Sequence, residues 1–179
     1  MVETNLKLAS EALIDKKLNN QINELIGQCF AVNRMLDRGM SLLNVRWKMV
    51  KTAQILHPKV AHAFPSAEFA DGLSDYQAQR SNETVYPATP IGDREYDKPI
   101  DFFNDMLKEF LSLQDMLYDT YEAANDISDY TTKAVISGII KNLVKYTDIA
   151  QLLIDLAENF GSDTMGIALM DASIDKYIN

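Results

Sequence analysis

The chain has 179 residues, of which 47% are hydrophobic and 24% are charged, and its formal net charge is −9 at pH 7. That length suffices for a single domain, residues 1–179, with a substantial core. The excess of acidic residues repels nucleic acid, and no apolar run reaches the ~18 residues that a membrane-spanning helix needs. Composition therefore argues against a membrane-spanning protein and against a general nucleic-acid binder.

Cysteine usage and the N-terminal sequence bear on the cellular compartment. The single cysteine, Cys29, excludes an internal disulfide framework and is typical of a reducing cytoplasm. It falls in an apolar helical pattern, which indicates a buried thiol rather than a nucleophile. No basic segment followed by an apolar one opens the chain in the manner of a secretory signal, so we expect a cytoplasmic protein.

The N-terminal half shows a helical pattern after residues 1–10, which we expect to form a flexible tail. Its apolar stripe comprises Leu13, Leu18, Ile22, Leu25, Ile26, Cys29, Val32 and Leu36, with a looser continuation at Leu43, Trp47, Val50 and Ile55. Two ends of this first long helix stay open. Gly39 could break it, and His57 precedes a proline and therefore avoids the α conformation.

A second helix is predicted over residues 58–80, followed by a long connection. Pro58 suits the first position of a helix, and Pro65 falls inside the segment and should kink or interrupt it. Residues 82–99 contain three prolines and Gly92 and show no helical pattern. We therefore expect residues 82–99 to form a crossover connection.

Two long helices are predicted in the C-terminal half, over residues 100–126 and 131–160, because apolar residues recur there with a period of about 3.6. The link between them is short, which makes them antiparallel neighbours. Residues 162–179 would form a C-terminal extension. The whole pattern predicts an all-α, ferritin-like antiparallel four-helix bundle with one long crossover connection.

Sequence signals also mark the ends of these two helices. Pro99 suits the first turn of the earlier helix. Ser128 or Asp129 could cap the start of the later one, and Gly161 is placed to close it.

Metal-binding residue types are concentrated in one stretch of the chain. Its only histidines, His57 and His62, precede two aspartates, Asp71 and Asp75, which are four residues apart and so share one face of a helix. Imidazole with carboxylate oxygens suits Fe(II) or Mn(II), with Zn(II) also acceptable. The alternatives are a solvated helix face for the aspartates, a helix-junction role for His57 and a packed core position for His62.

A di-iron centre inside a ferritin-like bundle requires Glu-x-x-His pairs. The sequence contains none, because Gln54 and Lys59 stand three residues before His57 and His62. We therefore expect no di-iron centre of that pattern within one subunit.

The order of several short motifs points to a known family. The segments are Leu42-Leu43-Asn44-Val45-Arg46-Trp47, then Leu56-His57, then Asp71 and Asp75, with Thr89-Pro90 and residues 145–153 fitting more loosely. This order resembles the Dps branch of the ferritin-like superfamily over roughly residues 18–161. In that family a His-Trp pair near the end of the first helix precedes Leu-His, and two acidic residues four apart follow on the second helix.

The resemblance implies a ferroxidase site at a two-fold interface between subunits, with histidines from one chain and carboxylates from the other. By position, His57 matches the Leu-His ligand, Asp71 the first carboxylate and Asp75 the second, where the family usually has Glu. Arg46 replaces the histidine of the His-Trp pair, and a guanidinium cannot ligate a metal. It would instead place a positive charge beside the carboxylates.

The resemblance implies a homo-oligomeric shell that binds, oxidises and stores iron and protects against oxidative stress. Manganese or zinc is the alternative metal. The alternative function is a ferritin-like bundle without ferroxidase activity that acts as a structural or binding oligomer, and Arg46 favours it. Lys7 is the only cation in residues 1–10, so we expect no tight binding of DNA at physiological salt.

Overall fold

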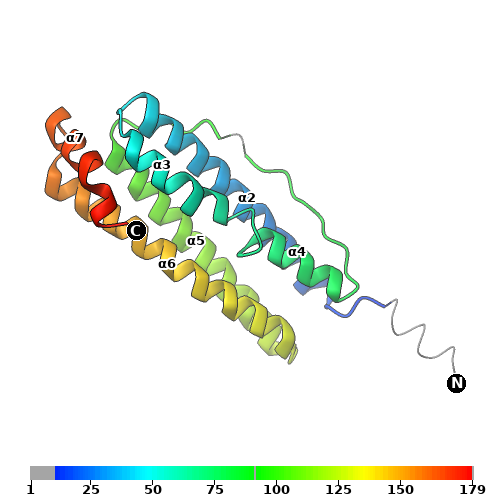
Figure 1. The fold of residues 1–179 in the computed structure, drawn as a ribbon. Coiled ribbons are helices and arrows are strands. Elements are labelled where there is room, and N and C mark those ends of the chain that lie inside the picture. Colours follow the sequence, from blue (N-terminus) through cyan, green and yellow to red (C-terminus); the bar gives the residue numbers. More distant parts are fainter. Residues whose placement is uncertain (1–10, 91, 179) are drawn as a thin grey trace, which may run out of the picture.

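The structure is a computed structural model that describes residues 11–90 and 92–178, and Figure 1 shows long helices packed side by side in one bundle. The expected flexible tail, residues 1–10, lies outside the described residues. The elements in chain order are α2 (Lys16–Val45), α3 (Val50–Lys59), the 3-10 turn η1 (Ala61–Ala63), α4 (Ala70–Gln79), α5 (Pro99–Asp126), α6 (Tyr130–Phe160), α7 (Thr164–Ser173) and the 3-10 turn η2 (Ile174–Lys176). Together α3, η1 and α4 take the place of the second helix of the four-helix bundle. The other three helices are α2, α5 and α6. The predicted four-helix bundle with one long crossover is confirmed.

The C-terminal half follows the sequence prediction to within one residue at each helix end. Pro99 occupies the first position of α5. Asp129, rather than Ser128, caps α6, and its carboxylate accepts a hydrogen bond from the Thr132 N–H at 3.1 Å. Gly161 follows α6 with a φ of +85°, a conformation that glycine adopts without strain.

The predicted end of helix α2 needs correction. Asp15 caps it by accepting the Lys17 N–H at 2.8 Å. The helix runs to Val45, so both predicted ends, Gly39 and His57, are wrong. Gly39 lies inside α2 where a Cβ atom would come within 2.0 Å of the Phe102 ring, so this glycine lets α2 approach α5 instead of breaking the helix.

The second helix of the bundle also departs from its prediction. A helix beginning at Pro58 is wrong, because α3 begins at Val50 and Pro58 lies inside its last turn. Proline lacks an N–H and crowds the preceding turn, so it helps to end α3 one residue later rather than beginning a helix. Pro65 lies in the predicted interruption, between η1 and α4. His57 is therefore held in the last turn of α3.

The crossover follows the outer side of α2 (Figure 1). It is non-helical from residue 82 to residue 98 wherever it is described, as predicted, while Pro99 belongs to α5. Near its start, Asn23 of α2 accepts the Val85 N–H at 3.0 Å. Near its end, Arg94 pairs with Asp105 and Glu109 of α5 at 2.6 and 2.8 Å. Both ends of the connection are thus fixed to the bundle.

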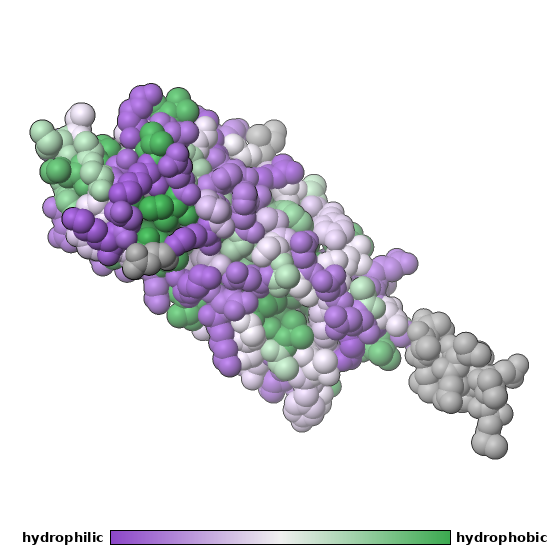
Figure 2. Space-filling view, in the orientation of Figure 1, coloured by the Kyte–Doolittle hydropathy of each residue, from purple (hydrophilic) through white to green (hydrophobic). Residues whose placement is uncertain are grey.

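The C-terminal extension contains α7, which packs across the end of the bundle against α6 and α3. Its outward side exposes Met165 and Leu169, at 69% and 52% of their full accessibility, and Figure 2 shows apolar surface at that end of the molecule. None of the helices in the described part of the chain combines the length and apolarity needed to cross a lipid bilayer.

Candidate functional site

The centre of the bundle is filled by aromatic rings. Phe64 stacks on Phe69 and Phe110 with ring centroids 4.7 and 5.0 Å apart, and Tyr146 packs at an angle against Phe64 and Phe69. Among the described residues, the buried polar side chains are Asn23, Thr52, Gln77, Thr120 and Thr132, so no buried aspartate, glutamate or histidine is present. Charged ligands for a metal must therefore come from the surface of the bundle.

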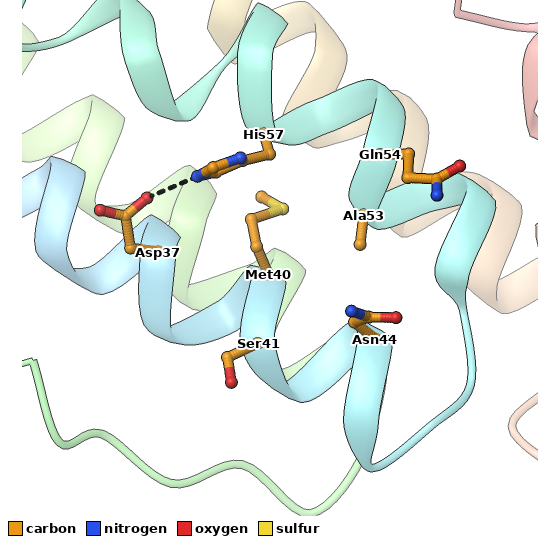
Figure 3. Close-up of a pocket in the computed structure, with 7 residues that line it drawn as sticks. All are labelled: Asp37, Met40, Ser41, Asn44, Ala53, Gln54 and His57. Carbon is orange, nitrogen blue, oxygen red and sulfur yellow. Dashed lines mark ion pairs between the residues drawn. The ribbon is translucent and has the colours of Figure 1, made fainter.

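A pair of side chains of the types that bind metals meets where α2 and α3 pack as an antiparallel hairpin. Asp37 of α2 and His57 of α3 face each other, with the Asp37 Oδ1 atom 3.2 Å from the His57 Nε2 atom (Figure 3). Their side chains are 47% and 45% exposed, so solvent and ions reach both groups. Twenty residues of sequence separate them, and the turn after Val45 brings them together.

The pair lies at one end of a shallow groove of about 400 Å³ between the two helices. The groove is lined by Asp37, Met40, Ser41 and Asn44 from α2 and by Ala53, Gln54 and His57 from α3. The α2 residues follow a helical spacing of three and four, which places them on one side of that helix (Figure 3). Beyond the Asp37–His57 pair, the lining thus combines the apolar side chains Met40 and Ala53 with the polar side chains Ser41, Asn44 and Gln54.

His62 stands beside this pair. Its ring centroid lies 4.3 Å from that of His57, with the two rings tilted by 59°. The backbone of η1 is tied to α2 by a hydrogen bond from Asn33 Nδ2 to the Ala61 carbonyl, at 2.9 Å. His62 is exposed, so the alternative that it packs in the core is wrong.

The aspartates of α4 lie elsewhere on the surface. Asp71 and Asp75 are both exposed and one turn apart on α4, as their spacing predicted. In the described residues of a single chain, no three His, Cys, Asp or Glu side chains come together in a way that could hold a metal ion. The pairing of His57 with Asp71 and Asp75 across a subunit interface therefore stays a prediction.

Arg46 has a structural partner on the crossover. Its Nη2 donates to Glu95 at 2.7 Å and its Nη1 donates to the Tyr96 carbonyl at 3.0 Å. Glu95 also pairs with Arg38. The hydrogen bond from Arg46, supported by that from Arg38 and by the charges of both arginines, holds the pKa of the Glu95 carboxyl below its ordinary value against the opposing effect of desolvation. Arg46 thus anchors the crossover beside the end of α2.

Sequence reasoning identified His57 as a candidate ligand but missed Asp37. Aspartate on the exposed side of a helix is common, so Asp37 carries no signal of its own. Only the correct end of α2 would have revealed the pairing. Because the chain turns back just after Val45, a residue about two turns before the bend, such as Asp37, lies opposite a residue about two turns after it, such as His57.

Comparison with known proteins bears on the class of fold. No protein-family model matches the sequence, and no curated protein matches it. The chain does have a ferritin-like helical-bundle fold, as the sequence predicted. A solved structure of similar fold is described as a novel open pore ferritin from the hyperthermophilic archaeon Archaeoglobus fulgidus. It aligns with a TM-score of 0.82 and 14% sequence identity, over 90% of this chain and 97% of that one.

Proposed function

We propose that this protein is a ferritin-like homo-oligomer that binds ferrous iron on the outer surface of its bundle and oxidises it there. The observation that carries the proposal is the position of His57. Its imidazole lies at the surface, open to solvent, with its Nε2 atom already facing a carboxylate. Because the described bundle interior offers aromatic rings and no buried acid or histidine, the surface is where this chain can present ligands.

A second copy of the chain would complete the centre. As the resemblance to the Dps family implies, His57 of one copy would share iron with Asp71 and Asp75 of another across a two-fold interface. A single copy brings too few ligands together in its described residues to hold a metal firmly. The similarity in fold to a protein described as an open pore ferritin supports the iron-handling class.

In this proposal the side chains bind iron, and peroxide oxidises it. Carboxylate oxygens bind iron and favour its ferric form, while the imidazole holds the ion in place. With peroxide as the oxidant, two ferrous ions each give up one electron, and one hydrogen peroxide with two protons becomes two water molecules. The net charge of −9 draws cations toward the protein. Manganese and zinc suit the same donors.

The second candidate function is a ferritin-like oligomer without ferroxidase activity. The observation that favours it is Arg46, which stands where the Dps family has a histidine and which binds Glu95 and the Tyr96 carbonyl. In that case the protein would still assemble into an oligomer, but the oligomer would have a structural or binding role and would not oxidise iron.

Anaerobic titration with Fe(II), followed by air or peroxide and combined with native mass measurement, tests the proposal. We expect saturable binding, oxidation faster than in buffer, and a homo-oligomer. The variant Asp71→Asn/Asp75→Asn should lose both binding and oxidation. Asp115→Asn/Asp119→Asn is the matched control, because these aspartates are also exposed and four residues apart, but on α5. An oligomer that neither binds nor oxidises iron would select the second candidate.

A further inference from the structure

A second groove opens where the end of α3, the middle of α6 and the C-terminal residues meet (Figure 1). Its volume is about 540 Å³, which is within the range of pockets that hold small molecules. The side chains that line it come from separate parts of the chain, and they are Pro58, Lys59, Glu68, Lys145, Ile149, Leu152, Tyr177 and Ile178. The proposed iron centre uses none of them.

We propose that this groove binds a small organic anion, specifically a carboxylate with an apolar body. The inference goes beyond the proposed function, because it requires neither iron nor a second copy of the chain.

Apolar side chains supply the surface for the body of the ligand. Ile149 and Leu152 are three residues apart on α6 and therefore share one side of that helix, where both are half-buried. Ile178 is buried, and its N–H donates to the Ile174 carbonyl at 3.0 Å, which fixes the C-terminal segment beside them. Each methylene group of a ligand that this surface removes from water should strengthen binding by up to about fourfold.

The one carboxylate of the groove already has partners. The Glu68 Oε2 atom accepts a hydrogen bond from the Tyr146 hydroxyl at 2.7 Å and lies 3.7 Å from the Lys145 ammonium group. That ammonium group also lies 4.6 Å from the centre of the Tyr146 ring. Tyr146 therefore holds both charged groups at one wall of the groove.

The second ammonium group of the groove is uncommitted. Lys59 is exposed at the end of α3, and its side chain makes no ion pair or hydrogen bond with the described residues. The groove thus has two positive charges against a single carboxylate that is already neutralised by Lys145. Charge complementarity therefore selects an anionic head group rather than an amine.

Octanoate is the probe, because it joins a carboxylate to a flexible apolar chain. Equilibrium dialysis of the full-length protein against labelled octanoate measures binding whatever the size of the oligomer. We expect saturable binding of one octanoate per chain, with hexanoate weaker and acetate not detected. Octylamine has the same apolar chain with the opposite charge, and it should bind more weakly than octanoate.

Two substitutions locate the site. Lys59→Gln and Lys145→Gln should each weaken octanoate binding by up to about fivefold, the usual limit for an exposed ion pair. Both residues are on the surface, so the variants should fold normally. Lys141→Gln is the matched control, because Lys141 is also an exposed lysine of α6 but does not line the groove. It should leave octanoate binding unchanged.

The absence of saturable octanoate binding would overturn the inference. Binding that responds equally to Lys141→Gln and to the two groove variants would place the anion elsewhere, and octylamine binding as tight as octanoate binding would refute the selection of an anion. The proposed function fails separately, since a protein that binds octanoate in this groove but does not oxidise iron refutes only that function.

Discussion

The carboxylate of Asp171, in α7, caps the start of α3, where it accepts the Thr52 N–H at 2.7 Å and the Lys51 N–H at 3.3 Å. Helix α3 has no cap of its own, since Met49 precedes it and offers no side-chain acceptor. About 120 residues of sequence lie between the cap and the helix that it stabilises. The C-terminal extension therefore supports the very helix that carries His57.

We expect Asp171→Ala to destabilise the protein by about 1 kcal/mol, because two N–H groups at the start of α3 lose their acceptor. Asp171→Asn should cost less, since the amide oxygen can still accept one of the bonds. Denaturant unfolding at fixed protein concentration measures both, with Asp148→Ala on α6 as the surface control. Equal stability of Asp171→Ala and the wild type would show that α7 does not cap α3.

Two glycines inside long helices should respond in opposite directions to alanine. At Gly39 the new Cβ would lie 2.0 Å from the ring of Phe102, a fully buried side chain, so we expect Gly39→Ala to cost about 1–3 kcal/mol. At Gly138 of α6 no heavy atom lies within 4 Å of the new Cβ, so Gly138→Ala should stabilise by about 0.5–1 kcal/mol. Thermal unfolding compares the pair. A neutral Gly39→Ala would contradict the close packing of α2 against α5.

The C-terminal helices were predictable because their signals are local. The apolar period, Pro99 at the first position of α5 and Asp129 before α6 all act within one or two turns. The end of α2 was not predictable in this way. A glycine usually indicates a break in a helix. Gly39 instead makes room for the ring of Phe102, which lies 63 residues later in the chain.

The candidate site was predictable only in its residue types. The scarcity of histidine singled out His57 and His62, whose rings do lie side by side. Asp37 could not be found, because its pairing depends on where α2 turns back, and the predicted helix ends were wrong. Whether Asp71 and Asp75 ever meet His57 depends on contact between copies, which the sequence of one chain does not specify.

The buried thiol of Cys29 gives a prediction for alkaline pH. Desolvation raises its pKa from 9.0 to about 12, against a smaller opposing effect of a backbone hydrogen bond. Above pH 9 the unfolded chain therefore loses the thiol proton while the folded chain keeps it. Ionisation then favours the unfolded state, and this group lowers stability by up to about 1.4 kcal/mol per pH unit until the folded pKa is reached.

Cys29→Ala isolates this effect, because the pKa values of Tyr76, Tyr96 and Tyr146 are also raised and contribute equally to both proteins. The free energy of unfolding is measured between pH 8 and pH 10.5, and the wild type should lose stability faster than the variant above pH 9. A thiol reagent should label the wild type only after unfolding. Rapid labelling of the native protein near pH 8 would show that the Cys29 thiol is accessible.

Arg46 should control the mobility of the crossover more than the stability of the bundle. Its partners Glu95 and the Tyr96 carbonyl lie in that connection, and ion pairs this exposed contribute no more than about 1 kcal/mol. We expect Arg46→Ala to speed hydrogen exchange and proteolysis over residues 92–98 while the midpoint of global unfolding changes little. High salt should have a similar effect on the wild type, since it screens the same pair.

Lys16→Ala is the control for this variant. Lys16 lies on the same helix, at its opposite end, and is exposed, and its ammonium group makes no ion pair or hydrogen bond with the described residues. It should leave the crossover as protected as in the wild type. If Arg46→Ala behaves like this control, then Arg38, through Glu95, and Arg94, through Asp105 and Glu109, hold the end of the crossover without Arg46. In that case Arg46 would have no measurable structural role.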